Sequence, residues 1–510
     1  MDNAAAAFVD QPIAEGLGDE TALVTPARRV TYAELSALVD RAGHALRARG
    51  VEPEQRVALL LPDGIGFAAV FFAAIKIGAV AVPLNTRLAS EDLRGILTDC
   101  RPKVLVAGPD AAGGGLEGLV ASADALLSGP GSGPLASETV GLDAMAFWLY
   151  TSGTTGAPKA VVHAHRTLLA GRHYGGDVLG VARGDRVFAT SKLFFPYALG
   201  NALVISLLAR ASAYLHPAWP DPASVAAVME SYRPTLFFSV PTFYAALLRA
   251  ALPPDTFASA RACVSAGERL PSEIYEAWRA RFGVEILDGM GATETVFMVL
   301  SNRPGESRAG ATGVPVPGTE AELRDAEGHA VADGEQGVLW VRTPSVAMGY
   351  YKRLDQSRRT FVGAWLRTGD VYRRDGDGFY EHCGREDDGF KVAGQWVMPG
   401  ELESVARRHP DVVDAGAVGA EDAGGLVKPF VFVVPRDSRV PPAELEVGVR
   451  RLIEASLPRH QWPRSIIVVR DLPRTDTGKL QRFRLRDQVL QDRVLQNRVP
   501  NHIQRGDNDS

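Results

Sequence analysis

Apolar residues recur along the first part of the chain at spacings typical of alternating helices and strands. The sequence from Thr31 to Glu34 is a capping box, because the threonine and glutamate side chains can accept from backbone N–H groups at a helix start. The helix pattern that follows has its apolar positions at Leu35, Leu38, Val39, Ala42 and Leu46. Apolar runs predict buried strands at 56–61, 79–82 and 104–107 and a buried helix at 67–77. This alternation indicates an α/β protein with a mostly parallel sheet covered on both faces.

The pattern changes twice further along the chain. Residues 108–138 are rich in Gly, Ala, Ser and Asp and predict a surface connection. Strand-like runs resume at 146–150, 235–240, 262–265 and 284–287. Beyond a polar joint at 386–389, short strands at 415–418, 430–434 and 466–469 and a helix at 443–457 predict an α+β domain.

The predicted organisation is therefore a large N-terminal body, residues 1–385, with several subdomains, and a small mobile C-terminal domain, residues 386–510. In the tail, the repeated VLQDRV and VLQNRV of 489–499 match no solenoid period and favour a fraying helix.

Composition excludes several classes of protein. Hydrophobic residues make up 46% and charged residues 23% of the 510 residues, which is ordinary for a packed soluble protein and excludes a disordered chain. The net charge of −5 gives no electrostatic reason to expect nucleic acid as a partner. Cys100, Cys263 and Cys383 have no CxxC spacing, which favours reduced thiols in a cytoplasmic protein.

No targeting or membrane-spanning segment is expected from the sequence. The start of the chain has no cationic stretch followed by an apolar run. The most apolar window, 67–84, is interrupted by Lys76 and Gly78 and closed by Pro83. A membrane helix needs about 20 apolar residues, so a buried helix followed by a buried strand is the better interpretation.

Residues 150–166, YTSGTTGAPKAVVHAHR, are typical of a phosphate-binding loop. Small residues allow backbone N–H groups to converge on an anion, and hydroxyls and Lys159 add donors. The pattern differs from a P-loop, because Gly153 and Gly156 are three residues apart and Ala160 cannot hold Mg²⁺. A P-loop NTPase or kinase is therefore disfavoured.

The whole string resembles the signature of the adenylate-forming superfamily, which contains acyl-CoA synthetases, peptide-synthetase adenylation domains and beetle luciferases. In that family the loop handles the β- and γ-phosphates of ATP. The matching residues here are Thr151, Ser152, Gly153, Thr154, Thr155, Gly156 and Lys159. Four further family motifs follow in order: DGMGATET (288–295), WLRTGD (365–370), GREDDGFKVAGQWVMPGELE (384–403) and PRTDTGKLQR (473–482).

The resemblance assigns a role to residues of each nucleotide motif. Glu294 would coordinate Mg²⁺ on the ATP phosphates, and Thr293 would contact the α-phosphate. Asp370 would accept hydrogen bonds from the ribose hydroxyls, and Arg385 would contact ribose or phosphate. The other residues that the resemblance assigns to nucleotide binding are Gly267, Glu268 and Asp288.

The same resemblance implies a catalytic lysine and a moving domain. Lys479 would bridge the substrate carboxylate and the α-phosphate, as a compact charge can do where negative charge develops. Asp387 would be the hinge about which the small domain reorients. The thiol tunnel would then be lined by Lys391, Gly394 and Trp396.

Within the superfamily, the segments 192–201, 239–250, 263–278, 281–294 and 300–305 resemble benzoate-CoA ligases. Flat and small side chains there could form a slot for an aromatic ring. The candidate pocket residues are Phe195, Tyr197, Ala198, Gly200, Ala266, Gly291, Phe297 and Met298. The chain departs from that subgroup at Pro196, at Ala198 and at Phe297, where the subgroup tends to have His.

The resemblance thus implies an AMP-forming aryl-acid:CoA ligase that uses ATP, Mg²⁺ and CoA and activates benzoate or an amino-, hydroxy- or heteroaryl acid. An aryl-acid:carrier-protein ligase that loads the phosphopantetheine of an acyl carrier protein is the alternative. A non-catalytic aryl-acid sensor is a third hypothesis, and a luciferase-like oxygenase has no positive feature. A monomer or homodimer is expected, without nucleic acid or membrane partners.

Overall fold

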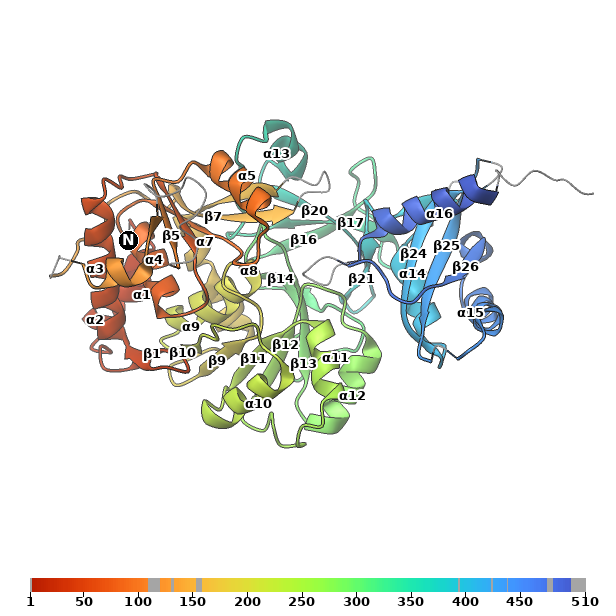
Figure 1. Cartoon of the computed structure of the whole chain (residues 1–510), viewed down its shortest axis with the longest axis horizontal. Helices are drawn as coiled ribbons and strands as arrows, with labels where there is room; N and C mark the ends of the chain where they lie inside the picture. The colour runs from red at the N-terminus through yellow and green to blue at the C-terminus, as the bar shows by residue number, and fades with distance from the viewer. Residues whose placement is uncertain are drawn as a thin grey trace, which may run out of the picture. The chain divides into compact units, whose positions relative to one another are not determined.

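A computed structural model describes residues 2–108, 120–129, 133–152, 158–392, 395–422, 425–437, 439–474 and 480–496. The chain divides into two units (Figure 1), and the segments of the second, smaller unit are 323–339, 369–373 and 382–510. The remaining residues form the first unit. The chain passes between the units within strands β16 (Glu320–Arg324), β17 (Gln336–Arg342), β20 (Trp365–Arg374) and β21 (Tyr380–Arg385).

The first unit contains a nine-stranded sheet in the order β15-β14-β13-β12-β11-β9-β10-β1-β2. The pairs from β1 to β13 are parallel, whereas β2 at one end and β14 and β15 at the other are antiparallel. Its strands are β1 (Thr21–Val24), β2 (Arg29–Thr31), β9 (Arg186–Ala189), β10 (Ser212–Tyr214), β11 (Leu236–Ser239), β12 (Ala262–Ser265), β13 (Ile286–Gly291), β14 (Met298–Ser301) and β15 (Val314–Pro315).

A second sheet of the same unit has the order β18-β8-β7-β4-β3-β5-β6. Its β3, β4, β5, β6 and β7 pair in parallel, and β8 and β18 continue the sheet antiparallel. The strands are β3 (Arg56–Leu60), β4 (Val80–Pro83), β5 (Val104–Ala107), β6 (Val120–Ala121), β7 (Met145–Ser152), β8 (Pro158–Ala164) and β18 (Gly349–Tyr350).

Helices pack on both sheets, and Figure 1 shows α10, α11 and α12 beside strands β9 to β13. The longer helices of this unit are α3 (Tyr32–Ala48), α4 (Ile65–Lys76), α5 (Ser90–Cys100), α10 (Pro222–Ser231), α11 (Pro241–Arg249) and α12 (Ser272–Phe282). The shorter ones are α1 (Ala5–Val9), α2 (Gln11–Ala14), α6 (Ala123–Leu127), α7 (His165–Leu169), η2 (His173–Val178), α8 (Pro196–Ala198), η3 (Leu199–Val204), α9 (Ile205–Leu208) and α13 (Leu354–Thr360). A two-residue strand, β19 (Phe361–Val362), follows α13.

The second unit has a three-stranded sheet, β24-β25-β26, and a two-stranded ribbon, β22-β23. Its elements are β22 (Phe390–Val392), β23 (Gln395–Val397), α14 (Pro399–Arg407), β24 (Val412–Glu421), β25 (Val427–Pro435), α15 (Pro442–Ser456), η4 (Arg459–Gln461), β26 (Ser465–Val468) and α16 (Arg482–Gln496). Leu402 of α14 and Ile453 of α15 pack with the sheet in one apolar core.

The predicted class, an α/β body with parallel-rich sheets followed by a C-terminal domain, is confirmed. The capping box is present, because Glu34 N–H donates to Thr31 Oγ1 and Thr31 N–H donates to the Glu34 carboxylate. The prediction of a surface connection over 108–138 is wrong for part of that range. Val120 and Ala121 extend the second sheet, and α6 buries Leu126.

Lys76 shows how a charge is tolerated in the apolar window. It is 1% exposed at the end of α4, and its Nζ lies 2.6 Å from Asp10 Oδ1 and 2.7 Å from Asp40 Oδ1. Burial of a charge is costly unless it is paired, so this pairing allows α4 to be buried on all sides. No helix among the described residues is long and apolar enough to cross a membrane.

Candidate active site

The phosphate-loop motif lies where β7 turns into β8 in the first unit. The two strands are antiparallel, and Thr151 pairs with Lys159 in the register. Gly153, Thr154, Thr155 and Gly156 lie outside the described residues, as does the side chain of Ser152. The strand pairing accounts for the position of Lys159, which stands at the start of β8.

Lys159, Glu294 and Tyr350 come together from separate parts of the sequence. Lys159 Nζ lies 3.8 Å from Glu294 Oε1 and 3.8 Å from the centroid of the Tyr350 ring. The Tyr350 hydroxyl donates to Glu294 Oε1 at 2.6 Å. Tyr350 is placed there because β18 pairs with β8, with Tyr350 opposite Val161. The sequence predicted Lys159 and Glu294 as site residues and missed Tyr350, whose position depends on a strand pairing between distant segments.

The turn between β13 and β14 holds Thr293 and Glu294 at the end of the nine-stranded sheet. Thr295 organises this turn, because its hydroxyl accepts from Ala292 N–H and donates to the Phe297 carbonyl. Val296 adopts a φ of 62°, which is costly for a β-branched residue and is typical of functional sites. The turn therefore stores strain between the residue predicted to bind metal and the residues predicted to bind the acid.

His163 of β8 is a second residue that the sequence analysis missed. Its ring is fully buried, stacks on Phe147 at 4.7 Å, and lies with Nε2 2.9 Å from the Thr293 carbonyl oxygen. Burial lowers the pKa of His163 to about 3, so the ring is neutral and donates from Nε2. His163 thus links the strand after the phosphate loop to the turn that carries Thr293.

The carboxylate of Glu294 suits a hard divalent cation. Its side chain is 15% exposed, so it is oriented by neighbours while keeping an accessible face. Mg²⁺ commonly takes one or two carboxylates together with phosphate oxygens and water. Among the described residues, no group of three or more His, Cys, Asp or Glu side chains forms a ready-made metal site. The single oriented carboxylate of Glu294 fits an ion whose other ligands are phosphate oxygens and water.

Gly267 and Glu268 follow β12, and Gly267 has a φ of 90° that favours glycine. Asp288 lies opposite Ser265 on the neighbouring strand β13. Burial raises the pKa of Asp288 well above its usual range, and only 7% of the residue is exposed. The structure thus brings Asp288 close to Gly267 and Glu268, the other two residues of this predicted nucleotide-binding group.

Several predicted pocket residues do gather around Phe297. A Cβ added at Gly200 would lie 3.1 Å from the Phe297 ring and 2.9 Å from Val296, and one at Gly171 would lie 2.8 Å from that ring. A Cβ at Gly291 would lie 2.8 Å from the Phe297 carbonyl oxygen. Glycine at 171 and 200 leaves room for the phenyl ring of Phe297, and glycine at 291 leaves room for the Phe297 backbone.

Tyr197 and Ala198 lie on α8, which begins at Pro196, a residue favoured at the first position of a helix. The Tyr197 hydroxyl lies 3.0 Å from the carbonyl oxygens of Ser239 and Val264, at the ends of β11 and β12. Ala266 follows β12, and Met298 begins β14. The ring of Phe195 contacts Phe194 at 4.4 Å between centroids.

A buried ion pair holds the segment that leads to Tyr197. Asp63 Oδ1 accepts from Leu193 N–H at 3.0 Å, and Asp63 Oδ2 lies 3.7 Å from Lys192 Nζ. Burial raises the pKa of Asp63 to about 6, and the positive charge of Lys192 limits this rise. Asp63 is 130 residues from Leu193, so no local pattern could have indicated this contact.

In the second unit, Asp370 and Arg385 form an ion pair on neighbouring motifs. Arg385 Nη1 lies 2.9 Å from Asp370 Oδ2, and His382 Nε2 lies 3.5 Å from Asp370 Oδ1. Burial by itself would raise the pKa of Asp370, but His382 and Arg385 outweigh it and lower the pKa. Asp370 is therefore ionised, and both of its oxygens can accept hydrogen bonds. His382 was missed by the sequence analysis.

The hinge and tunnel residues also belong to the second unit. Asp387 is exposed in a turn that closes when the N–H groups of Asp388 and Gly389 donate to the Arg385 carbonyl. Lys391 of β22 pairs with Trp396 of β23 in the ribbon. Gly394, the side chain of Trp396 and Lys479 lie outside the described residues.

These features define a class of protein: an enzyme of two units, with nucleotide motifs in each unit. The AMP-binding enzyme family model matches residues 11–351, and the AMP-binding enzyme C-terminal domain model matches residues 401–479. The chain therefore belongs to the AMP-binding enzyme family, in the adenylate-forming superfamily, and the predicted resemblance is confirmed.

Curated relatives extend over nearly the whole chain. A 3-hydroxybenzoate–CoA ligase of Aromatoleum sp. (strain CIB) is 39% identical and covers 95% of this chain and 96% of its own length. A 4-hydroxybenzoate–CoA/benzoate–CoA ligase of Rhodopseudomonas palustris is 40% identical over 96% of this chain and 94% of its own. Among solved structures, a benzoate CoA ligase from Burkholderia xenovorans LB400 is 38% identical, with a TM-score of 0.87 over 95% of this chain and all of that chain.

Proposed function

We propose that the protein is an AMP-forming aryl-acid:CoA ligase that activates benzoate or a substituted benzoate. The observation that carries the proposal is the single strained turn 292–298. This turn presents Glu294 to Lys159 and Tyr350 on one side and packs Phe297 against Gly200 on the other. One short segment thus serves the phosphates and the acid. The relatives with benzoate and hydroxybenzoate in their names support the same class of substrate.

In the first half-reaction, a carboxylate oxygen of the acid attacks the α-phosphorus of ATP. A P–O bond forms to the acyl group, and the bond to pyrophosphate breaks. Lys159 places a positive charge beside the departing phosphates, and Thr293 offers a hydroxyl to the α-phosphate, so electrostatic positioning lowers the barrier. Glu294 would hold Mg²⁺, which when bound neutralises charge on the phosphates. Lys479 would bridge the acid and the α-phosphate.

In the second half-reaction, the CoA thiol loses its proton to solvent and its sulfur attacks the acyl carbon of the aryl-AMP. The C–S bond of the thioester forms, the bond between the acyl carbon and the phosphate oxygen breaks, and AMP leaves with the bonding electrons. The small domain, 386–510, would turn about Asp387 between the steps, so that 391–396 line the path of the thiol. Asp370 and Arg385 would hold the ribose. A cytoplasmic location, and a monomeric or homodimeric state, stay predictions.

Pyrophosphate release with a panel of substituted benzoates, combined with mass detection of the aryl-CoA product, tests the proposal. We expect both pyrophosphate and an aryl-CoA from at least one acid when CoA is present. Pyrophosphate without a CoA thioester, together with loading of a phosphopantetheinylated carrier protein, would replace CoA by a carrier as the acceptor. No pyrophosphate with any acid would favour the non-catalytic sensor.

A further inference from the structure

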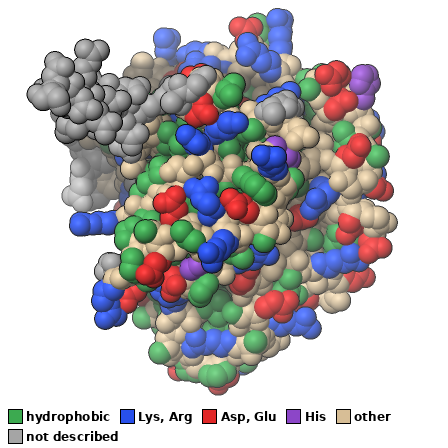
Figure 2. Space-filling view, turned by 90° about the vertical axis from the view of Figure 1, so that its right-hand side faces the viewer, with side chains coloured by type: hydrophobic (Ala, Val, Ile, Leu, Met, Phe, Trp, Pro, Cys, Tyr) green, Lys and Arg blue, Asp and Glu red, His purple; other side chains and the backbone are tan. Residues whose placement is uncertain are grey.

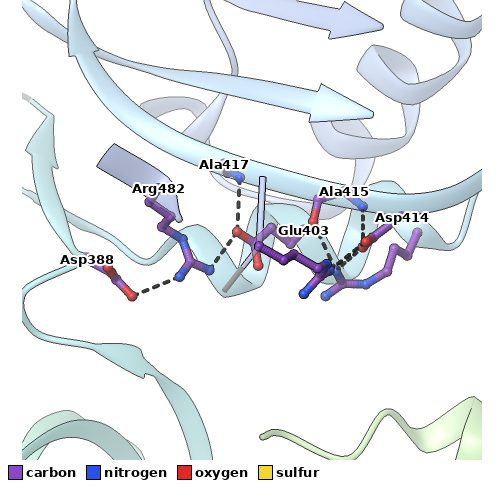
Figure 3. A network of polar contacts seen from close by, with 8 residues as sticks. Asp388, Glu403, Asp414, Ala415, Ala417 and Arg482 are labelled. Atoms are coloured by element: carbon purple, nitrogen blue, oxygen red, sulfur yellow. Dashed lines mark hydrogen bonds and ion pairs between the residues drawn. The ribbon is translucent and has the colours of Figure 1, made fainter. Parts of the chain in front are cut away.

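Arg482, the first residue of α16, is the centre of a polar network in the second unit (Figure 3). Its Nη1 donates to Asp388 Oδ2 at 2.8 Å, and its Nη2 donates to Glu403 Oε1 at 2.7 Å. The side chain is 20% exposed. Arg482 thus contacts two carboxylates that lie 94 and 79 residues earlier in the chain, and its planar fork suits two partners at once.

Glu403 is the carboxylate that connects Arg482 to the core of the second unit. Its side chain on α14 is 7% exposed, and its Oε1 also accepts from Ala417 N–H of β24 at 2.9 Å. A buried carboxylate is stabilised only when its charge is paired and its oxygens are hydrogen-bonded. Glu403 therefore attaches Arg482 to both the helix and the sheet of the unit.

Asp388 is the second carboxylate that Arg482 contacts, and it directly follows the predicted hinge residue Asp387. Its N–H donates to the Arg385 carbonyl at 3.1 Å, while its carboxylate turns to Arg482 and is 31% exposed. The ion pair holds the first residue after the hinge to α16. A change in backbone angles can then be taken up at Asp387 itself instead of spreading into the following strand.

The residues just before and just after 475–479, the stretch that contains Lys479, contact each other. Arg474 pairs with Leu480 as an isolated antiparallel bridge, and Gln481 N–H donates to the Pro473 carbonyl at 2.8 Å. Arg474 Nη2 also donates to Asp414 Oδ2 at 2.6 Å, at the start of β24. Arg482 lies three residues after Lys479 in the sequence.

We infer that Arg482 is a positioning residue that makes the hinge-proximal Asp388, the α14–β24 core and the flank of the Lys479 segment move as one body. The inference rests on the proposed function, since it assigns Lys479 to adenylation and Asp387 to the hinge. Arg482 touches no reacting atom in this account. It transmits the rotation at Asp387 to residues 480–482, which follow Lys479 in the sequence, so its removal should impair the step that is assigned to the lysine.

The test compares the two half-reactions in Arg482→Gln. We expect the rate of aryl-AMP formation, measured by pyrophosphate exchange, to fall at least tenfold. Thioester formation from supplied aryl-AMP should fall less than threefold, because that step does not use Lys479. Arg482→Lys should lose less activity than Arg482→Gln. The lysine ammonium can pair with one of the two carboxylates, Asp388 or Glu403, but lacks the planar fork that reaches both. Asp388→Asn should lower activity less than Arg482→Gln and add little to it in the double variant.

Arg439→Gln is the matched control, because it removes another arginine–aspartate pair of the same unit whose arginine side chain is 88% exposed. Equal losses in both half-reactions, or losses that follow the fraction of folded protein, would overturn the inference and leave Arg482 a stabilising residue. Hydrogen–deuterium exchange over 388–392 provides a readout without substrates, and we expect faster exchange in Arg482→Gln. If wild-type protein makes no aryl-AMP, the proposed function fails. The hydrogen–deuterium exchange result still tests whether Arg482 holds 388–392.

Discussion

At the scale of single residues, the phenol of Tyr350 is a sharp test of the site because its ring and its hydroxyl do different things. The ring lies under the Lys159 ammonium, and the hydroxyl donates to Glu294. Tyr350→Phe keeps the ring and removes the donor. A hydrogen bond to a charged group contributes about 1.5–3 kcal/mol, so we expect the KM for MgATP to rise roughly tenfold with a smaller change in kcat.

Steady-state kinetics at varied MgATP measure this effect. Tyr351→Phe is the matched control, since the Tyr351 ring lies 4.3 Å from that of Trp148 and belongs to the adjacent position in the chain. If Tyr350→Phe and Tyr351→Phe change the KM alike, Tyr350 does not orient Glu294.

Phe297 is the predicted pocket residue through which the choice of acid can be tested. It lies against Gly171 and Gly200, at a position where the benzoate-CoA ligases that the chain resembles tend to have a polar histidine. Phe297→His would restore a polar group in that space. Because one pocket group can change selectivity by about 1–3 kcal/mol, we expect the ratio of kcat/KM for a hydroxybenzoate over benzoate to change by roughly tenfold.

The measurement is kcat/KM for benzoate and for 2-, 3- and 4-hydroxybenzoate with both proteins, with the melting temperature as a check on folding. Ratios that stay the same for all hydroxy acids would mean that residue 297 does not face the ring.

At the scale of elements, α4 depends on the pairing of Lys76. Lys76→Met leaves Asp40, which is 9% exposed, as a buried carboxylate without its cation. Loss of one partner of a buried ion pair typically costs about 3–5 kcal/mol, and we expect that loss in the free energy of unfolding measured with urea. Adding Asp40→Asn should recover part of it. Lys103→Met, at an exposed lysine, should change the free energy by less than about 0.5 kcal/mol.

Local elements were predictable from the sequence, and long-range contacts were not. The capping box at Thr31 and the strand at Val104–Ala107 follow from neighbouring residues and from a short apolar run, so the pattern determines them. Tyr350 reaches Glu294 only because β18 joins β8, and a single sequence carries no information on that pairing. Asp63 and His163 were missed for the same reason. The motifs still located Lys159, Glu294, Asp370 and Arg385, because each motif is short and continuous.

At the scale of the whole molecule, the numbers of acidic and basic residues are nearly balanced, with 60 Asp and Glu against 55 Lys and Arg. Figure 2 shows a face on which acidic and basic side chains are interspersed with apolar ones, in keeping with a net charge of −5. The response of stability to pH is therefore set by buried groups. Among these are His163 and His165, for which burial lowers the pKa to about 3 and about 4. The Nδ1 of His165 accepts from Ala4 N–H, so its neutral form is the one that the fold uses.

We expect the contribution of His163 and His165 to stability to fall as the pH drops from 6.5 towards 4. The unfolded chain protonates both histidines near pH 6.5, whereas the folded chain does not until pH 3–4, so stability present above pH 6.5 is lost on acidification. Asp63, with its pKa raised to about 6, acts in the opposite sense and offsets about one proton. Asp288, whose pKa burial raises well above its usual range, offsets a second proton, so the net slope between pH 6 and 5 is close to zero.

Urea unfolding at pH 7, 6 and 5 measures the slope for wild-type protein and His165→Asn. The variant lacks one of the two histidines, so its slope should be lower than that of wild type by about 1.4 kcal/mol per pH unit, and its stability should rise as the pH drops from 6 to 5. An unchanged slope in His165→Asn would mean that other groups control the acid response.

The proposed reorientation of the C-terminal domain can also be tested through one residue. Asp387 is exposed in the turn 385–389, so we expect the protein to fold with a substitution at this position. Asp387→Pro fixes φ near −65° and removes the rotation that the second half-reaction needs. Pyrophosphate exchange should stay within about threefold of wild type, whereas thioester formation from aryl-AMP should fall by roughly a hundredfold or more, about 2.7 kcal/mol in barrier. Asp387→Ala, which keeps a free φ, should retain both half-reactions. Loss of exchange along with thioester formation in the proline variant would show that residue 387 supports adenylation itself, and the hinge would have to lie elsewhere.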